Sequence, residues 1–109
     1  MDIGAIRERV RAGKYLIRSH AVYHALKEGF GRNHMVQAVL TGVVIEEYPD
    51  SQRVLVCGSA ALSEEVTTYL HVVCEYADTV YVEFVTAYIP DELEWESPPL
   101  RRRRRGSRK

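Results

Sequence analysis

The sequence has only two cysteines, no long apolar run and no leader-like start, and each shortage excludes a class of protein. Cys57 and Cys74 each stand singly in an apolar stretch, which excludes a zinc-finger spacing and a disulfide scaffold. No segment approaches the roughly 20 apolar residues of a membrane-spanning helix. Residues 1–4 lack the basic start and apolar run of a signal peptide. We therefore expect a cytoplasmic protein with reduced thiols, with a single disulfide between adjacent strands as the alternative.

Several local motifs of enzymes are missing as well. Gly29-Phe30-Gly31 follows no strand pattern, so it does not have the context of a nucleotide-binding loop. No serine has the setting of a nucleophile elbow, and neither cysteine stands at a helix start that would stabilise a thiolate. His20 and His24 have the spacing of a helical metal pair but no third ligand in the motif. We expect neither a metal nor a cofactor.

Charge is divided unevenly along a chain whose net charge is zero. Residues 1–45 carry a net charge of +4, residues 46–100 carry −11, and residues 101–109 carry +7. An anionic substrate should therefore approach the N-terminal part, and the acidic middle part should repel it. The five-arginine run Arg101–Arg105 is typical of a disordered segment. We expect a single domain over residues 1–96 and a flexible basic tail over residues 97–109.

The apolar period changes near Gly42 from helical spacing to the two-residue alternation of strands. Helices followed by strands with short connections predict an α+β fold, with N-terminal helices packed on a mainly antiparallel sheet of four to five strands. Ser19 and Asn33 are the expected caps of the second and third helices. The expected helices cover residues 3–12, 20–28 and 34–41; the expected strands cover 14–18, 43–48, 53–57, 67–76 and 79–89; residues 58–65 are expected to form a loop.

His20 and His71 are the residues expected to carry any chemistry. His20 follows a strand and stands in the first turn of a helix, where backbone N–H groups favour an anion. His71 lies within the apolar strand Leu70-His71-Val72-Val73, so it requires either a buried partner or an opening into a pocket. The alternative for each histidine is a purely structural role. We predict that the two imidazoles lie within about 10 Å and flank an open pocket, as a pair in acid/base catalysis must.

Five short motifs resemble a known family in their order and spacing. The chain is similar to domain-of-unknown-function family 4258 over about residues 3–100. That family resembles the RelE/BrnT-type toxins, which are small α+β ribonucleases of toxin–antitoxin modules. The motifs are Ser19-His20-Ala21, Gly29, Thr41–Pro49, Leu70-His71-Val72-Val73 and Thr86-Ala87-Tyr88-Ile89-Pro90 followed by Trp95.

The resemblance implies a RelE/BrnT-like fold, an RNA substrate and a cognate antitoxin, often a small zinc-finger protein. It places the family's two characteristic histidines on His20 and His71, and its threonine-tyrosine pair on Thr86 and Tyr88. The position of His24 is usually an arginine in that family, where it would contact phosphate.

The sequence thus favours a metal-independent endoribonuclease. His20 and His71 would act as acid and base, and Tyr88 would orient a histidine or the phosphate. Lys14, Arg18 and His24 form the expected substrate-binding set, since cations offset the charge of the transition state. Two alternatives stay open. One is a non-catalytic interaction module whose acidic sheet face binds a basic partner and whose histidines lie in the core. The other is a nonspecific nucleic-acid binder that acts through its arginine tail.

Overall fold

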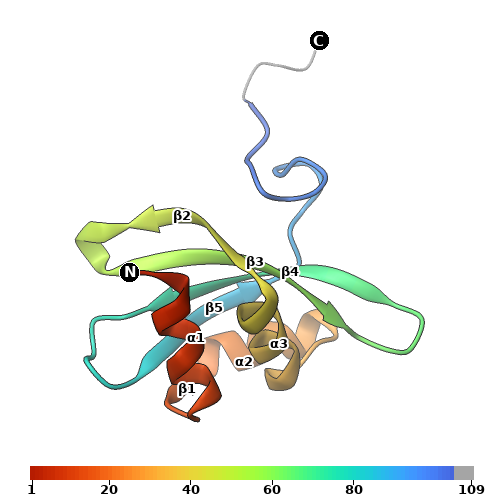
Figure 1. Ribbon diagram of the computed structural model, residues 1–109. Coiled ribbons are helices and arrows are strands. Elements are labelled where there is room, and N and C mark those ends of the chain that lie inside the picture. Colours follow the sequence, from red (N-terminus) through yellow and green to blue (C-terminus); the bar gives the residue numbers. More distant parts are fainter. Residues whose placement is uncertain (105–109) are drawn as a thin grey trace.

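The computed structural model describes residues 1–104, and residues 105–109 lie outside the described part. Three helices lie on one side of a five-stranded sheet, and the segment that follows β5 lies on the other side (Figure 1). This is the predicted α+β architecture. The elements are α1 (Ile3–Arg11), β1 (Tyr15–Ile17), α2 (Ser19–Glu28), α3 (Arg32–Thr41), β2 (Val43–Tyr48), the 3₁₀ turn η1 (Pro49–Ser51), β3 (Arg53–Ala61), β4 (Thr67–Glu75) and β5 (Val82–Tyr88).

The strands lie in the order β1-β5-β4-β3-β2. The meander from β2 to β5 is antiparallel, and β1 joins β5 at the edge in the parallel sense. The prediction of a mainly antiparallel sheet with residues 14–18 at one side is therefore confirmed. The parallel edge arises because α2, α3 and three strands intervene between β1 and β5, so no hairpin joins the two strands.

Glycines mark the ends of α1 and α2, whereas the caps predicted for the starts of α2 and α3 are not found. Gly13 and Gly29 have φ values of 76° and 90°, and this left-handed conformation ends α1 and α2 without the steric penalty of a Cβ atom. The predicted caps Ser19 and Asn33 are wrong, because Arg18 precedes α2 and Gly31 precedes α3. His34 replaces the expected cap of α3, since its Nδ1 accepts a hydrogen bond from the Gly31 N–H at 2.9 Å.

Strand β3 is four residues longer than the sequence predicts. The predicted loop over residues 58–65 is wrong for Gly58–Ala61, which continue the ladder with β4. Gly58 lies where α3 crosses the sheet, and a Cβ atom there would stand 1.8 Å from the carbonyl oxygen of Ala38. A glycine within a strand often marks such a close approach rather than a turn.

The two faces of the sheet have different coverings. Leu70, Val72 and Cys74 of β4 join the core beneath the helices. His71 points to the opposite face, as alternation along a strand requires. We call this opposite side the open face. Cys57 is paired with His71 and shares the open face, so Cys57 and Cys74 lie on opposite faces, are both free, and the alternative of a disulfide is wrong.

Residues 90–104, here called the C-terminal segment, fold back on themselves above the open face. Trp95 is buried, and it forms an isolated antiparallel bridge with Arg102. Backbone N–H groups of Glu96 and Arg103 donate to the carbonyls of Arg101 and Glu94 at 2.9 and 2.8 Å. Within the flexible tail expected over residues 97–109, Pro99, Arg102 and Arg103 therefore contact other parts of the chain, and residues 105–109 lie outside the described part. Within residues 1–104, no helix has the length and apolar character needed to cross a membrane.

Candidate functional site

His71 is wholly enclosed beneath the C-terminal segment. Its exposed fraction is 0%, the only such value for a polar or charged residue among residues 1–104. The ring meets Trp95 edge-on, with ring centroids 4.4 Å apart, and Tyr88 with centroids 5.2 Å apart. Its Nε2 lies 2.8 Å from the carbonyl oxygen of Pro99, and its Nδ1 lies 3.2 Å from the Tyr88 hydroxyl.

These two partners define the protonation of the His71 ring. A carbonyl oxygen only accepts, so Nε2 donates its hydrogen to Pro99. Nδ1 is then the acceptor in a neutral ring, and the hydroxyl of Tyr88 donates to it. Burial lowers the pKa of His71 below its ordinary value, and burial raises the pKa of Tyr88 to about 12. Both groups are thus held neutral and satisfied around neutral pH.

The predicted pocket between His20 and His71 is wrong. His71 lies on the open face with both ring nitrogens occupied, whereas His20 lies on α2, which packs on the helical side through Ala21 and Ala25. His20 is exposed and stacks on His24, with ring centroids 6.2 Å apart and an interplanar angle of 5°. The physical reason is the C-terminal segment, which covers the space above His71 that a substrate would need.

The expected substrate-binding residue His24 holds α2 against the end of the sheet. Its Nδ1 lies 2.9 Å from the carbonyl oxygen of Ala87 in β5. Its Nε2 lies 3.3 Å from the Glu28 carboxylate one turn along the helix, a contact that is an ion pair only when the ring is protonated. Glu28 in turn accepts a hydrogen bond from the Ile89 N–H at 2.8 Å. These contacts give His24 a structural role at the end of β5.

An ion pair fastens the C-terminal segment to strand β2. The Arg102 guanidinium donates to both oxygens of Glu46, at 2.7 and 3.1 Å, and lies over the Trp95 ring at 4.6 Å from its centroid. Glu46 also accepts a hydrogen bond from the Tyr48 hydroxyl. The hydrogen bond from Arg102 lowers the pKa of the Glu46 carboxyl, and burial raises the pKa of Tyr48. A bidentate pair of this kind fixes orientation as well as charge.

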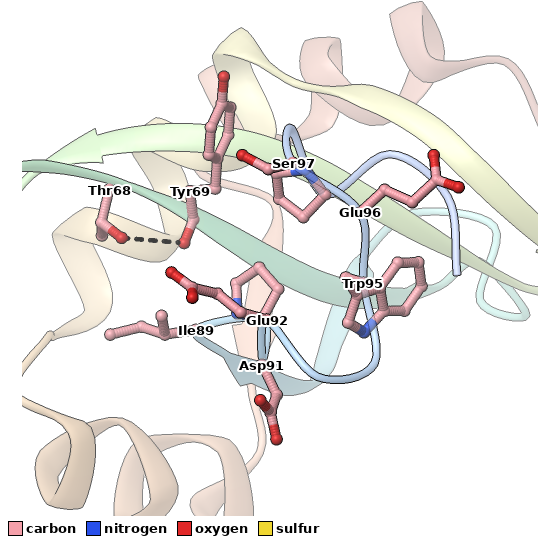
Figure 2. A pocket seen from close by; sticks show the side chains of 10 residues that line it. Thr68, Tyr69, Ile89, Asp91, Glu92, Trp95, Glu96 and Ser97 are labelled. Carbon is pink, nitrogen blue, oxygen red and sulfur yellow. Dashed lines mark hydrogen bonds between the residues drawn. The ribbon is translucent and has the colours of Figure 1, made fainter. Parts of the chain in front are cut away.

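A cavity of about 160 Å³ lies between β4 and the first half of the C-terminal segment (Figure 2). Thr68 and Tyr69 line its strand side, and Trp95 and two prolines line the opposite side. Three carboxylates, those of Asp91, Glu92 and Glu96, complete the lining. Figure 2 shows the Glu92 carboxylate pointing towards the strand side, with the carboxylates of Asp91 and Glu96 pointing outwards.

Within residues 1–104, no ion pair involves a carboxylate of this cavity. The five ion pairs formed among residues 1–104 include neither Asp91 nor Glu92 nor Glu96. The sequence pattern alone indicates no role for these residues. The sequence shows only that acidic residues are dense around the single tryptophan. That these residues line a cavity depends on Thr68 and Tyr69 of β4, which form its other side.

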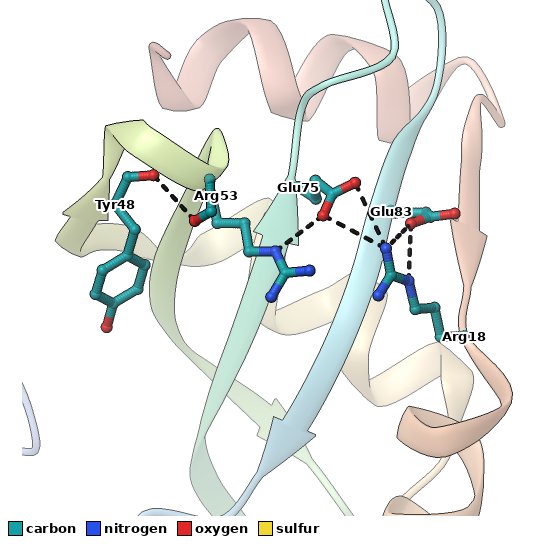
Figure 3. A network of polar contacts seen from close by, with 6 residues as sticks. Arg18, Tyr48, Arg53, Glu75 and Glu83 are labelled. Carbon is teal, nitrogen blue, oxygen red and sulfur yellow. Dashed lines mark hydrogen bonds and ion pairs between the residues drawn. The ribbon is translucent and has the colours of Figure 1, made fainter.

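Arg18, expected to bind phosphate, is held by carboxylates on the open face (Figure 3). Its guanidinium lies 2.7 Å from Glu83 of β5 and 3.4 Å from Glu75 of β4. Arg53 of β3 approaches the same Glu75 at 2.9 Å. Glu75 and Glu83 are direct cross-strand neighbours, so Arg18 offsets a repulsion between like charges. The side chain of Lys14, the other expected phosphate ligand, is exposed next to β1.

Other reactive groups in the described part of the chain are buried or dispersed. Burial raises the pKa of Cys57 to about 11 and that of Cys74 to about 12, so both remain protonated thiols at neutral pH. Among residues 1–104, no three side chains of His, Cys, Asp or Glu lie together as a potential metal site.

We compared the chain with known protein families, curated proteins and solved structures. No protein-family model matches the chain, and no curated protein or solved structure was found to be similar to it.

Proposed function

We propose that this chain is a binding module for a basic protein segment, which docks against residues 91–96, here called the acidic loop, around Trp95. The observation that carries the proposal is that this loop already binds two arginines of the chain itself. Arg102 lies over Trp95, and the Arg103 Nε donates to the Glu92 carbonyl at 2.6 Å. The backbone and aromatic groups of the loop are thus arranged to receive guanidinium groups.

The charge of the surrounding chain supports the same proposal. Residues 46–100 carry a net charge of −11, and the three carboxylates at the cavity are free of ion pairs within residues 1–104. Such a surface attracts a basic segment and repels the phosphates of RNA. The enclosed position of His71 fits a structural role for this residue in a binding module.

The test is a titration of the full chain with a fluorescein-labelled peptide of sequence RRRRRGSRK, followed by fluorescence anisotropy. The peptide should bind at low salt and weaken as salt rises, because exposed ion pairs are screened. The matched probe replaces each arginine with citrulline, which has nearly the same shape but no charge. Equal affinity for the two peptides, or no binding of either, would reject the proposal.

A second candidate is the endoribonuclease suggested by the family resemblance. The observation that favours it is the exposed His20, stacked on His24 within the net basic part of the chain. In this proposal His20 is the reacting histidine, and the partner is an antitoxin. Cleavage of a labelled RNA that falls about 10²- to 10⁴-fold in His20→Ala would support it. Wild-type protein that leaves the RNA intact would reject it.

A further inference from the structure

We infer that the cavity between β4 and the C-terminal segment receives a single arginine side chain of the basic partner. This inference rests on the proposed function and adds to it a particular site and a particular residue type. The cavity has a volume of about 160 Å³. Pockets for drug-sized ligands have about 300–1,000 Å³. The volume therefore suits one long side chain.

The lining has the two chemistries that an arginine requires. Glu92 offers a carboxylate that points towards the strand side of the cavity, and among residues 1–104 no lysine, arginine or histidine lines the space. Trp95, Pro90 and Pro99 provide apolar surface for the aliphatic stem. Tyr69 adds a half-exposed aromatic ring at the strand side, and aromatic faces attract cations.

The outer carboxylates extend the attraction beyond the cavity. Asp91 and Glu96 are exposed and point outwards in Figure 2, where they would meet the residues that flank the inserted arginine. Arginine fits better than lysine because its planar guanidinium both pairs with a carboxylate and stacks on a ring. Arg102 already shows this pairing in the same segment, with Glu46 and Trp95 as its two partners.

The experiment compares the affinity of the labelled RRRRRGSRK peptide for the full chain and for three single variants. Glu92→Gln removes the carboxylate charge at constant shape, and Thr68→Arg places a guanidinium at the cavity wall. Asp50→Asn is the control and removes one exposed charge in η1. This turn leads into the first residue of β3, whereas Thr68 pairs with Ala60 near the last residue of β3. Circular dichroism and the emission maximum of Trp95, the single tryptophan, verify that each variant is folded.

We expect Kd to rise about fivefold for Glu92→Gln and at least as much for Thr68→Arg, the upper range for an exposed ion pair. Asp50→Asn should change Kd less than twofold, and a peptide with lysine in place of arginine should bind more weakly. Binding that is equal in Glu92→Gln, Thr68→Arg and wild type would overturn the cavity while leaving the proposed function standing. Equal binding of the lysine peptide would overturn the assignment to arginine. Failure of the arginine peptide to bind wild type would overturn both proposals.

Discussion

At the scale of single residues, His71 holds the C-terminal segment over the centre of the open face. A histidine in an apolar strand needs two hydrogen-bond partners when it is buried. Tyr88 and Pro99 supply them from sites 17 and 28 residues away. The ring therefore ties β4 to β5 and to the C-terminal segment, and its loss would leave a hydroxyl and a carbonyl group without partners.

The first prediction concerns the stability of a His71 variant. His71→Ala should lower the free energy of unfolding by about 2–4 kcal/mol, because it leaves a cavity and unpaired polar groups. His20→Ala is the matched control and should change stability by less than about 0.5 kcal/mol, since His20 is exposed. Urea unfolding followed by Trp95 fluorescence measures both. A His71→Ala protein as stable as wild type would mean that the contacts of this ring contribute little.

The second prediction concerns pH. The folded-state pKa of His71 is lowered by burial, so the unfolded chain binds a proton more readily than the folded chain. Stability contributed by this group is complete above the unfolded pKa near 6.5. It declines as pH falls from there towards the lowered folded pKa. As the pH is lowered from 8 to 5, the urea concentration at the unfolding midpoint should therefore fall more steeply in wild type than in His71→Gln. The same pH dependence of the urea midpoint in both proteins would contradict this role of His71.

At the scale of elements, α3 and β3 meet at a contact that only glycine permits. Gly58 faces the Ala38 carbonyl so closely that an added methyl group requires the helix or the strand to shift. This contact allows α3 to lie directly on the centre of the sheet.

The third prediction follows from that contact. Gly58→Ala should destabilise the fold by about 1–3 kcal/mol through overpacking. Ser59→Ala, at the next residue of the same strand, should have a much smaller effect because its side chain points to the open face. Thermal unfolding of the two variants provides the comparison. A Gly58→Ala protein that melts together with wild type would show that α3 moves freely enough to accept a methyl group.

The C-terminal segment is the element that sequence reasoning placed least well. Strands such as β2, with the same bounds as predicted, follow from a local alternation of side chains. The inward direction of Val72 and the outward direction of His71 follow from the same alternation. The packing of Pro99 and Arg102 depends on partners 28 and 56 residues away, for which the local pattern holds no signal. The candidate site was missed for this reason.

The fourth prediction tests the packing of this segment. A chain that ends at Leu100 should be about 1 kcal/mol less stable than one that ends at Arg104, because it lacks the Arg102 contacts with Glu46 and Trp95. Its Trp95 emission should also shift to longer wavelength as the indole meets water. The single variant Arg102→Gln, which removes only the charge, should reproduce most of both effects. Identical emission spectra for the two chain lengths would contradict the packing described for Arg102.

At the scale of the whole molecule, the basic N-terminal part and the acidic middle part of the sequence form different parts of the fold. The basic N-terminal part contributes the helices and the edge strand, and Arg18 is used to join strands β4 and β5. The acidic part forms most of the sheet and the loop beside Trp95. Arginines 102 and 103 show the acidic loop binding basic groups within one chain. A basic partner would bind to the carboxylates of the same loop.

The most direct test of the binding proposal is to locate the arginine peptide on the folded chain. Uniformly ¹⁵N-labelled protein would be titrated with unlabelled RRRRRGSRK peptide, and amide and indole signals followed by NMR. We expect the largest shift changes at Thr68, Tyr69 and Glu92 and at the Trp95 indole N–H, with the signals of α1 unchanged. Signals of the acidic loop that stay fixed while those around His20 move, or a spectrum that does not change at all, would contradict the binding proposal.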